Sequence, residues 1–556
     1  MHPVFAVGKE HPMKINEAVA RTLRELGVQT LFGLIGDANL FVVDAYIKAG
    51  GRYIGAANEM GAVLMALGHA SVTGQIGVAT VTCGPGLTNT MTALIEGVKA
   101  RTSLVLITGD APSSQKYHFQ KANHQELVVA TGAGYEGASS LESVADDLVN
   151  AFRRAAVEQR PIVFNMPPHN FQWQDVVPER HARLVQPHRV GRVADSDELD
   201  AAIGMIATAK RPVILAGLGV VKGEAREQVL QLARRLDAPL LTTLRAKDLF
   251  HGDPLSLGIL GISAREEALD PMAVADCIVT FGASLNFITT ALGALVKDKR
   301  VVFVNDDPQE FGKHMVADAN VLGDCASTAE RMVYWLDEAE IAPSGFASEP
   351  RVREAAAAVA LPRPIKAPST PKAMNVHEVL QAISRMVTGE YLLVTDGGRH
   401  MAHAWDAFHV SEPRRFVHTT MFGAIGLGLP HAIGAAAAEP RLPTVAVVGD
   451  GGFMLGGLTE FNTAVRERMD IIVLLLNDAS YGAEYVQFTA RGMDPSIALF
   501  QWPDFAPVAQ ALGGVGVTMK TLDDLDAVRE AITRRSGKGP VLIDIHLDPA
   551  HVPPSF

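Results

Sequence analysis

The 556-residue chain contains few cysteines, little positive charge and no long apolar run. Its three cysteines, Cys83, Cys277 and Cys325, lack a CxxC spacing, which excludes a disulfide framework and indicates a reduced, cytoplasmic protein. The net charge of −12 argues against nucleic acid as a partner. The longest weakly polar stretch, residues 424–438, is too short and too interrupted to cross a membrane, so no membrane partner is expected.

Apolar residues make up 48% of the chain and charged residues 20%, as in a globular protein, and the length suits three or four domains. Short β-branched runs that end in Gly, Asp or Asn alternate with alanine- and leucine-rich segments of helical pattern. This alternation is typical of parallel sheets covered on both faces. The expected strands are 28–36, 76–82, 102–109, 161–167, 212–217, 275–282, 300–306, 391–396, 444–450, 471–477 and 540–548.

Two irregular segments divide these strands into three sets. Residues 168–196 are rich in Pro, His and Arg, and residues 342–372 contain six prolines, which prevent a continuous helix. The sequence therefore predicts an α/β protein with three doubly wound parallel-sheet domains, at residues 12–180, 190–340 and 373–556. Ligands of such sheets bind at the carboxyl ends of the strands, where functional groups are expected.

Two neighbouring expected strands of the third set end in metal-ligating residue types. One runs into the turn Gly449-Asp450-Gly451-Gly452, and the next runs into Asn477-Asp478-Ala479-Ser480. Carboxylate and amide oxygens suit Mg²⁺, and the glycines would let the backbone approach a diphosphate at a helix N-terminus. Taken alone, the sequence Gly449-Asp450-Gly451-Gly452 also fits an ordinary tight turn between a strand and a helix.

The spacing of these two turns resembles the signature of thiamine diphosphate enzymes. The likeness covers the whole chain and is strongest to the branch that holds acetolactate synthase, pyruvate and indolepyruvate decarboxylases, and 2-hydroxyacyl-CoA lyases. It implies a pyrimidine-binding first domain, a Rossmann-like central domain and a third domain that binds the diphosphate and Mg²⁺.

The resemblance also implies the metal ligands. Asp450, Asp478 and the backbone carbonyl of Ser480 would bind Mg²⁺. Family members commonly have Asn in place of Asp478, and this chain has one extra residue near residues 456–457, so Asn477 remains an alternative ligand.

The diphosphate is expected to meet residues of the same strand ends. Gly451 and Gly452 would face it, Arg399 and His400 match positions that approach it, and Tyr481 is expected to contact the cofactor. The alternative is that Arg399 and His400 are ordinary solvated loop residues.

The cofactor needs a carboxylic acid beside its pyrimidine ring, and a buried carboxyl with a raised pKa suits this role. Glu59, which follows the strand-like pair Tyr53-Ile54, resembles the family's glutamate. The alternative is that Glu59 is an ordinary charged residue in the first turn of a helix. By the same resemblance Ile425 would support the bent cofactor and the Gly423 carbonyl would accept its amino group. Family members build this site across two subunits, so a homodimer or homotetramer is implied.

The residues that decide the reaction point two ways. Asp37, His124 and Glu484 resemble the proton-relay groups of simple decarboxylases, although each also suits an ordinary turn or surface position. Gln125 and the segment Thr82–Asn89 resemble acetolactate synthase. That enzyme's FAD-holding Arg-Phe-Asp-Asp-Arg segment is replaced here by residues 283–290, which makes FAD doubtful.

These features predict a thiamine diphosphate- and Mg²⁺-dependent 2-oxo acid decarboxylase or carboligase, with a small 2-oxo acid or aldehyde as substrate. The alternatives are an acetolactate synthase-like transferase, a 2-hydroxyacyl-CoA lyase-like enzyme and an inactive paralogue that acts as a binding subunit. The short tail after Asp548 leaves little chain to cover a CoA. A Rossmann-type dehydrogenase is disfavoured because no GxGxxG turn follows a strand.

Overall fold

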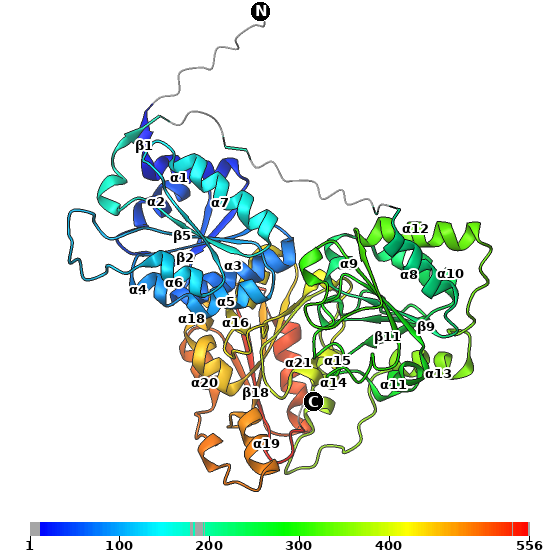
Figure 1. Ribbon diagram of the computed structural model, residues 1–556. Helices are drawn as coiled ribbons and strands as arrows, with labels where there is room; N and C mark the ends of the chain where they lie inside the picture. The colour runs from blue at the N-terminus through cyan, green and yellow to red at the C-terminus, as the bar shows by residue number, and fades with distance from the viewer. Residues whose placement is uncertain (1–11, 178–181, 184–192, 194, 536, 554–556) are drawn as a thin grey trace, which may run out of the picture.

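The computed structural model describes residues 12–177, 182–183, 193, 195–535 and 537–553. The expected domain limits at residues 180 and 190 lie outside the described residues. Figure 1 shows three units, with the first (blue to cyan) at the upper left, the central one (green) at the right and the third (yellow to red) below. Each unit contains a six-stranded parallel sheet with helices on both faces, which confirms the predicted fold class.

The first sheet has the strand order β3-β2-β4-β5-β7-β6. Its strands are β2 (Thr30–Gly33), β3 (Arg52–Gly55), β4 (Gly77–Val81), β5 (Leu104–Thr108), β6 (Gly134–Gly137) and β7 (Pro161–Asn165). Its helices are α1 (Ile15–Glu25), α2 (Leu40–Lys48), α3 (Glu59–Thr73), α4 (Pro85–Thr88), α5 (Met91–Lys99), α6 (His124–Ala130) and α7 (Val144–Glu158). The short strands β1 (Met13–Lys14) and β8 (Asp175–Val176) pair beside this sheet.

The central sheet has the order β11-β10-β9-β12-β13-β14, which is the 3-2-1-4-5-6 order of the Rossmann fold. Its strands are β9 (Pro212–Ala216), β10 (Leu240–Thr242), β11 (Ser256–Ile259), β12 (Cys277–Phe281), β13 (Arg300–Asn305) and β14 (Ala319–Leu322). Its helices are α8 (Asp197–Ala207), α9 (Leu218–Lys222), α10 (Arg226–Leu236), α11 (Glu266–Val274), α12 (Cys325–Glu338) and α13 (Pro350–Val359).

The third sheet, β16-β15-β17-β18-β20-β19, repeats the topology of the first. Its strands are β15 (Leu392–Thr395), β16 (Phe416–His418), β17 (Thr444–Gly449), β18 (Ile471–Asn477), β19 (Val515–Met519) and β20 (Val541–His546). Its helices are α14 (Val376–Ser384), α15 (Met401–Ala407), α16 (Gly428–Ala438), α17 (Asp450–Gly452), α18 (Leu458–Arg466), α19 (Gly482–Ala490), α20 (Phe505–Ala511) and α21 (Leu525–Arg534).

Helices α3 and α16 join the first and third domains. They are the equivalent helices of the two matching topologies, and they cross in close contact between the two sheets. The crossing is close because Gly68 lies against the His431 carbonyl and Gly434 lies against the Met65 carbonyl. One continuous apolar core therefore runs from the first sheet to the third and holds the two domains together.

No helix in the described part of the chain is long and apolar enough to cross a membrane. The three cysteines are all buried and free.

Candidate cofactor site

Two aspartates end neighbouring strands of the third sheet. Asp396 follows β15, Asp450 follows β17, and the two strands pair directly in parallel. From β15 the chain goes to β16 on one side and then returns to β17 on the other, so the connections diverge here. Such a switch point leaves a crevice at the carboxyl ends of the strands, where open α/β sheets bind their ligands.

Asp396 anchors the loop that precedes α16. It is 1% exposed and accepts hydrogen bonds from the backbone N–H groups of Gly397 (2.8 Å), Gly426 (2.9 Å) and Leu427 (3.3 Å). Burial raises the pKa of this carboxyl, and the N–H donors oppose the rise. Asp396 therefore fixes residues 426–427 beside the crevice, a role that the sequence does not predict.

The three expected metal ligands lie together. The backbone N–H of Ser480 donates to Asp450 Oδ2 at 3.2 Å, and its hydroxyl donates to Asp478 Oδ1 at 2.6 Å. Both carboxylates are buried. Burial and the nearby charge of Asp478 raise the pKa of Asp450 to about 7.

Asn477 faces a different neighbour. Its side-chain amide donates to Asp544 Oδ1 at 2.9 Å, and its own oxygen accepts the N–H of Ala479 at 3.3 Å. These bonds tie the end of β18 to β20. The Asn477 side chain is therefore engaged on the side of β20, while Asp478 is bonded to Ser480.

Arg399 neutralises Asp478. Its Nε and Nη2 atoms donate to Asp478 Oδ2 at 2.9 and 2.6 Å, and Nη1 donates to the carbonyls of Pro549 (2.9 Å) and Val552 (3.1 Å). The guanidinium is therefore placed beside the expected metal ligands and ties the C-terminal residues to them.

His400 lies under the turn that follows β17. A Cβ added at Gly449 would lie 3.1 Å from the His400 ring. The pKa of His400 is lowered to about 3, mainly because the ring is buried. Arg399 and His400 are each 6% exposed, so the alternative of ordinary solvated loop residues is wrong.

The glycines of the turn are required by the protein's own packing. A Cβ at Gly451 would lie 2.7 Å from the ring of Tyr481, and one at Gly452 would lie 2.8 Å from the Asp396 carboxylate. Any larger residue would collide with these groups. The ring of Tyr481 thus lies against the turn.

The helix after this turn contains an extra residue. Residues Phe453–Gly457 form a π-helical turn between α17 and α18. A π turn is a one-residue insertion in an α-helix and is common at functional sites. It accommodates the extra residue that the sequence indicates near 456–457. Gly456 is needed there because a Cβ would lie 2.2 Å from the Gly426 carbonyl oxygen.

The loop that carries Gly423 and Ile425 is fixed from the first domain. The backbone N–H groups of Met421 and Phe422 donate to the two carboxylate oxygens of Glu96 at 2.9 and 2.7 Å. Gly423 has a φ of +85°, which explains the glycine there. Glu96 is buried, and burial raises its pKa to about 7 against the opposing effect of these donors.

Glu59 is the first residue of α3 and is fixed from the third domain. Its Oε2 accepts a hydrogen bond from the Asn89 amide at 3.0 Å. The two preceding N–H groups, of Ala57 and Asn58, donate to the buried carboxylate of Glu460 on α18 at 3.1 and 3.2 Å. The backbone before Glu59 is thus held in the same way as the backbone before Gly423.

Glu96 and Glu460 are therefore reciprocal. Each lies on a helix between the third and fourth strands of its sheet, and each binds the loop that follows the edge strand β3 or β16 of the other domain. The sequence does not predict either role. The available signal is a glutamate in an otherwise apolar helical pattern, but the partner N–H groups are far away in the chain.

The residues expected to decide the reaction are not joined in one chain. His124 is 4% exposed; its Nε2 accepts the Gly84 N–H at 3.0 Å, and its Nδ1 is 2.8 Å from Asn165 Oδ1. Both ring nitrogens are thus engaged within the first domain. Asp37, Gln125 and Glu484 are exposed, and in the described part of the chain no hydrogen bond or ion pair joins Asp37, His124 and Glu484.

Three family models match the chain. They are the thiamine pyrophosphate enzyme N-terminal TPP binding domain at residues 13–131, the central domain at 199–332 and the C-terminal TPP binding domain at 396–545. Each match falls on one of the three six-stranded sheets.

Full-length relatives agree with these matches. The acetolactate synthase large subunit of Buchnera aphidicola is 26% identical over 97% of this chain and 95% of its own. The sulfoacetaldehyde acetyltransferase of Alcaligenes xylosoxydans is 28% identical over 95% of this chain and 92% of its own. The acetolactate synthase of Mycobacterium leprae is 27% identical over 95% and 86%. The chain therefore belongs to the thiamine pyrophosphate enzymes.

Proposed function

We propose that this protein is a thiamine diphosphate- and Mg²⁺-dependent enzyme that decarboxylates a small 2-oxo acid. The acyl carbon that remains is then either protonated or joined to a second carbonyl. The observation that carries the proposal is the pair of buried carboxylates, Asp450 and Asp478, bonded to one residue at the switch point of the third sheet. A cytoplasmic location is part of the proposal.

The residues at the switch point fit a divalent cation. Asp450 and Asp478 offer hard oxygen ligands, and Mg²⁺ commonly takes one or two protein carboxylates together with phosphate oxygens. The raised pKa of Asp450 reflects its burial near a second negative charge, a situation that a bound cation relieves. Asp478 and the Ser480 carbonyl complete the proposed set. Asp478 is preferred to Asn477 because it bonds Ser480, which also bonds Asp450, whereas Asn477 bonds Asp544 on β20.

The cofactor would lie between this site and the start of α3. When bound, thiamine diphosphate supplies a nucleophilic carbon and accepts the electron pair that CO₂ leaves behind. Glu59 would hold a proton beside the pyrimidine ring, and the Gly423 carbonyl would accept the amino group. Ile425 would support the bent cofactor, while Gly451, Gly452 and Tyr481 would face the diphosphate end. In this arrangement Arg399 holds Asp478 in place through two hydrogen bonds, and His400 supports the glycine turn.

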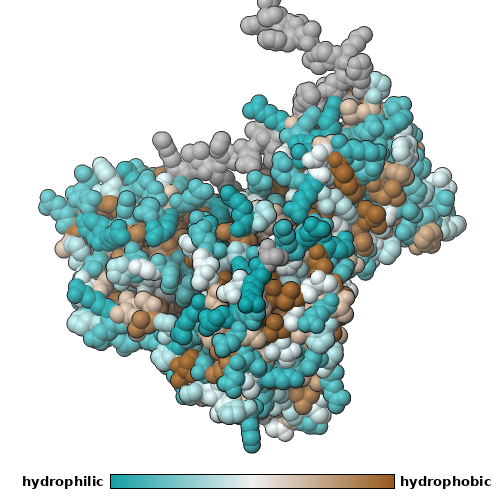
Figure 2. Space-filling model, turned by 180° about the vertical axis from the view of Figure 1, so that it is seen from behind, coloured by the Kyte–Doolittle hydropathy of each residue, from teal (hydrophilic) through white to brown (hydrophobic). Residues whose placement is uncertain are grey.

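We place the complete site between two copies of the chain. Ile35 is 58% exposed next to Asp37, Leu455 is 61% exposed in the π turn, and Phe422 is 42% exposed next to Gly423. Large apolar side chains exposed beside a site favour coverage by a partner. Figure 2 shows hydrophobic patches among a mostly hydrophilic surface on the face opposite to Figure 1. A second chain would bring the exposed Asp37 and Gln125 of its first domain to the site, beside the exposed Glu484 of this chain, so a homodimer or homotetramer is proposed.

Transfer to a second acceptor is the second candidate outcome. Relatives named acetolactate synthase and sulfoacetaldehyde acetyltransferase favour it, and so does the engagement of His124 in structural bonds, which weakens the proton-relay interpretation. An acetolactate synthase proper would copurify with FAD and be yellow. We expect a colourless protein, because residues 283–290 differ from the flavin-holding segment.

The test is a panel of 2-oxo acids with thiamine diphosphate and Mg²⁺, in which released CO₂, aldehydes and acyloins are measured. We expect CO₂ from at least one acid, and a rate lower by about 100-fold in Glu59→Gln, because an acid–base group is lost. Glu126→Gln, an exposed substitution in the same domain, is the matched control. Unchanged turnover of Glu59→Gln would refute the role of Glu59. No CO₂ from any acid, together with no exchange of the thiazolium proton, would favour an inactive paralogue.

A further inference from the structure

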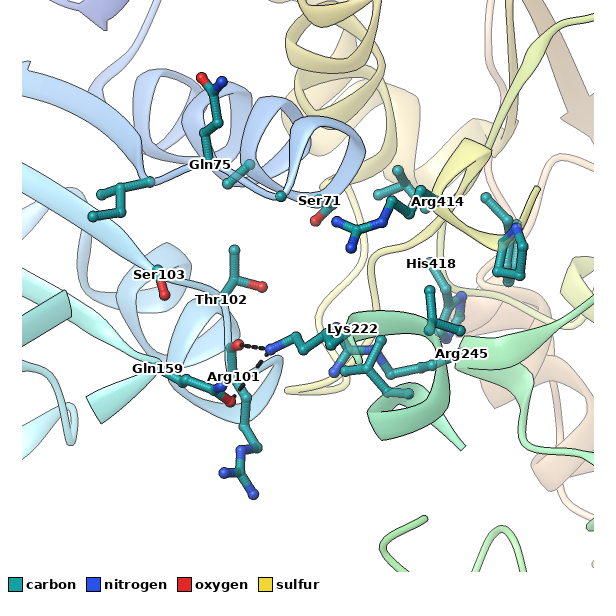
Figure 3. Close-up of a pocket in the computed structure, with 18 of the residues that line it drawn as sticks. Ser71, Gln75, Arg101, Thr102, Ser103, Gln159, Lys222, Arg245, Arg414 and His418 are labelled. Carbon is teal, nitrogen blue, oxygen red and sulfur yellow. Dashed lines mark hydrogen bonds between the residues drawn. The ribbon is translucent and has the colours of Figure 1, made fainter. Parts of the chain in front are cut away.

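A cavity of about 450 Å³ lies where the three domains meet, and none of its lining residues belongs to the proposed cofactor or metal residues. Its walls come from the end of α3, the segment before β5, the end of α7, helix α9, residue 245 and the segment that leads into β16. The residues are Ala70, Ser71, Gly74, Gln75, Ile76, Arg101, Thr102, Ser103, Ala156, Gln159, Leu218, Val221, Lys222, Arg245, Pro413, Arg414, Phe416, Val417 and His418. Figure 3 shows this cavity.

The lining is positively charged. It includes three arginines and one lysine, while aspartate and glutamate are absent from the lining residues in the described part of the chain. This contrasts with the overall charge of −12. A concentration of cations in a recess of an acidic protein favours an anionic ligand.

The four cations are not equivalent. Arg101 forms ion pairs with Asp307 (2.6 Å) and Glu310 (3.1 Å), and in Figure 3 its guanidinium points away from the other labelled cations. Its charge is therefore balanced outside the cavity. Lys222, Arg245 and Arg414 are the other cations of the lining, and Figure 3 shows them around one space.

All three cations lie at domain contacts: Lys222 and Arg245 of the central domain face the first domain, and Arg414 of the third domain faces the central domain. Lys222 donates to the Arg101 carbonyl at 3.0 Å and to Gln159 Oε1 at 3.4 Å, and Arg245 donates to the Ala100 carbonyl at 2.7 Å. Arg414 is 4.0 Å from Glu224, an 86%-exposed carboxylate. Burial lowers the pKa of Arg245 to about 10, Glu96 opposes this change and Arg101 adds to it, so Arg245 stays positively charged at neutral pH.

The composition of the walls indicates the class of ligand. A phosphate monoester carries about −1.5 to −2 charges and three acceptor oxygens, which matches several cations better than a single carboxylate does. The hydroxyls of Ser71, Thr102 and Ser103 add polar groups, while Ile76, Leu218 and Val221 provide apolar surface for the rest of a molecule. The volume lies within the range of small-molecule sites.

We propose that this three-domain cavity binds a small phosphorylated metabolite through Lys222, Arg245 and Arg414. The site is separate from the proposed diphosphate and Mg²⁺ site. Binding here therefore does not depend on the catalytic proposal.

Calorimetric titration tests this inference on the full-length protein saturated with thiamine diphosphate and Mg²⁺, so that the proposed cofactor site is filled. AMP and glucose 6-phosphate are the probes, adenosine and glucose are their uncharged controls, and citrate is the carboxylate control. We expect at least one phosphate ester to bind, and neither uncharged control. If both esters fail to bind, or if citrate binds as tightly as they do, the proposal is wrong.

Variants locate the binding. Lys222→Gln and Arg414→Gln are expected to weaken it at least tenfold, whereas Lys297→Gln, the same charge change at an exposed position of the central domain, leaves it unchanged. Gln159→Glu places a negative charge beside Lys222 without removing a cation, and it is expected to weaken binding similarly. Binding that survives in all three cavity variants would overturn the assignment.

Discussion

Replacing Gly434 by alanine adds one methyl group where α16 crosses α3. The added Cβ would lie 1.8 Å from the Met65 carbonyl oxygen and 2.7 Å from its carbonyl carbon. These are backbone atoms of a buried helix, so no side chain can rotate away. A normal carbon–oxygen contact is about 3.3 Å, and the two helices must therefore move apart locally.

The cost follows from what this movement disturbs. Overpacking of a core typically costs about 1–3 kcal/mol, and the upper value applies because the crossing lies in the core shared by two domains. Alanine is favoured over glycine within a helix by about 1 kcal/mol. We therefore expect Gly434→Ala to lower the free energy of unfolding by about 2 kcal/mol.

Gly204 provides a matched control. It lies in the exposed part of α8, and a Cβ built there would meet no atom within 4 Å. The same substitution should stabilise the protein at this position by about 0.5–1 kcal/mol. The same Gly→Ala substitution in two helices is thus expected to change the free energy of unfolding in opposite directions.

Urea unfolding followed by far-ultraviolet circular dichroism measures both effects. The proteins should be compared at one concentration, because association stabilises the folded chain. A Gly434→Ala protein as stable as the wild type would show that the two helices separate at no cost, and would refute the argument from close crossing.

Three other substitutions test further contacts. Glu96→Gln should remove a pH dependence: burial raises the Glu96 pKa from 4.5 to about 7, so the wild type loses up to about 3 kcal/mol as pH rises between these values, and the variant does not. Equal slopes of Tm against pH from 5 to 8 would contradict this. Asp478→Ala should weaken Mg²⁺-dependent thiamine diphosphate binding at least tenfold in a fluorescence titration, with Asp494→Ala as an unaffected control. Lys247→Met should lower the free energy of unfolding by about 3–5 kcal/mol in a thermal unfolding experiment, because the buried carboxylate of Asp248 loses its lysine partner. A smaller decrease in the double variant Lys247→Met/Asp248→Asn would confirm the pairing.

Most interior strands could be predicted from the sequence, whereas the three-residue interior strand β10 and most edge strands could not. The expected runs correspond to β2, β4, β5, β7, β9, β12, β13, β15, β17, β18 and β20, all of which have neighbours on both sides. Such strands are buried on both faces and appear as continuous apolar runs. The edge strands β6, β14 and β19 mix buried with exposed or partly exposed residues, so they lack a continuous apolar run and their pattern resembles a loop.

The grouping of the expected metal residues follows from the same rule. Asp450 and Asp478 come at the ends of adjacent parallel strands, so their proximity is a consequence of the topology. The bond of Arg399 to Asp478 was not predictable, because it depends on where the C-terminal residues 549–552 pass. The bond of Asn477 to Asp544 was likewise not predictable, because it depends on the position of β20 beside β18.

Glu96 and Glu460 show why local sequence patterns miss some important residues. Each is a buried carboxylate whose partners are backbone N–H groups, and any residue except proline supplies such a group. The partner therefore leaves no mark in the sequence. Their reciprocity also has a mechanical consequence: each domain holds the loop that leads to the other's proposed cofactor residue, Glu59 or Gly423. A charged group that is buried and bonded in this way costs free energy when either partner moves. The two loops are therefore coupled to the α3–α16 crossing, so that a change at the crossing alters both halves of the proposed site together.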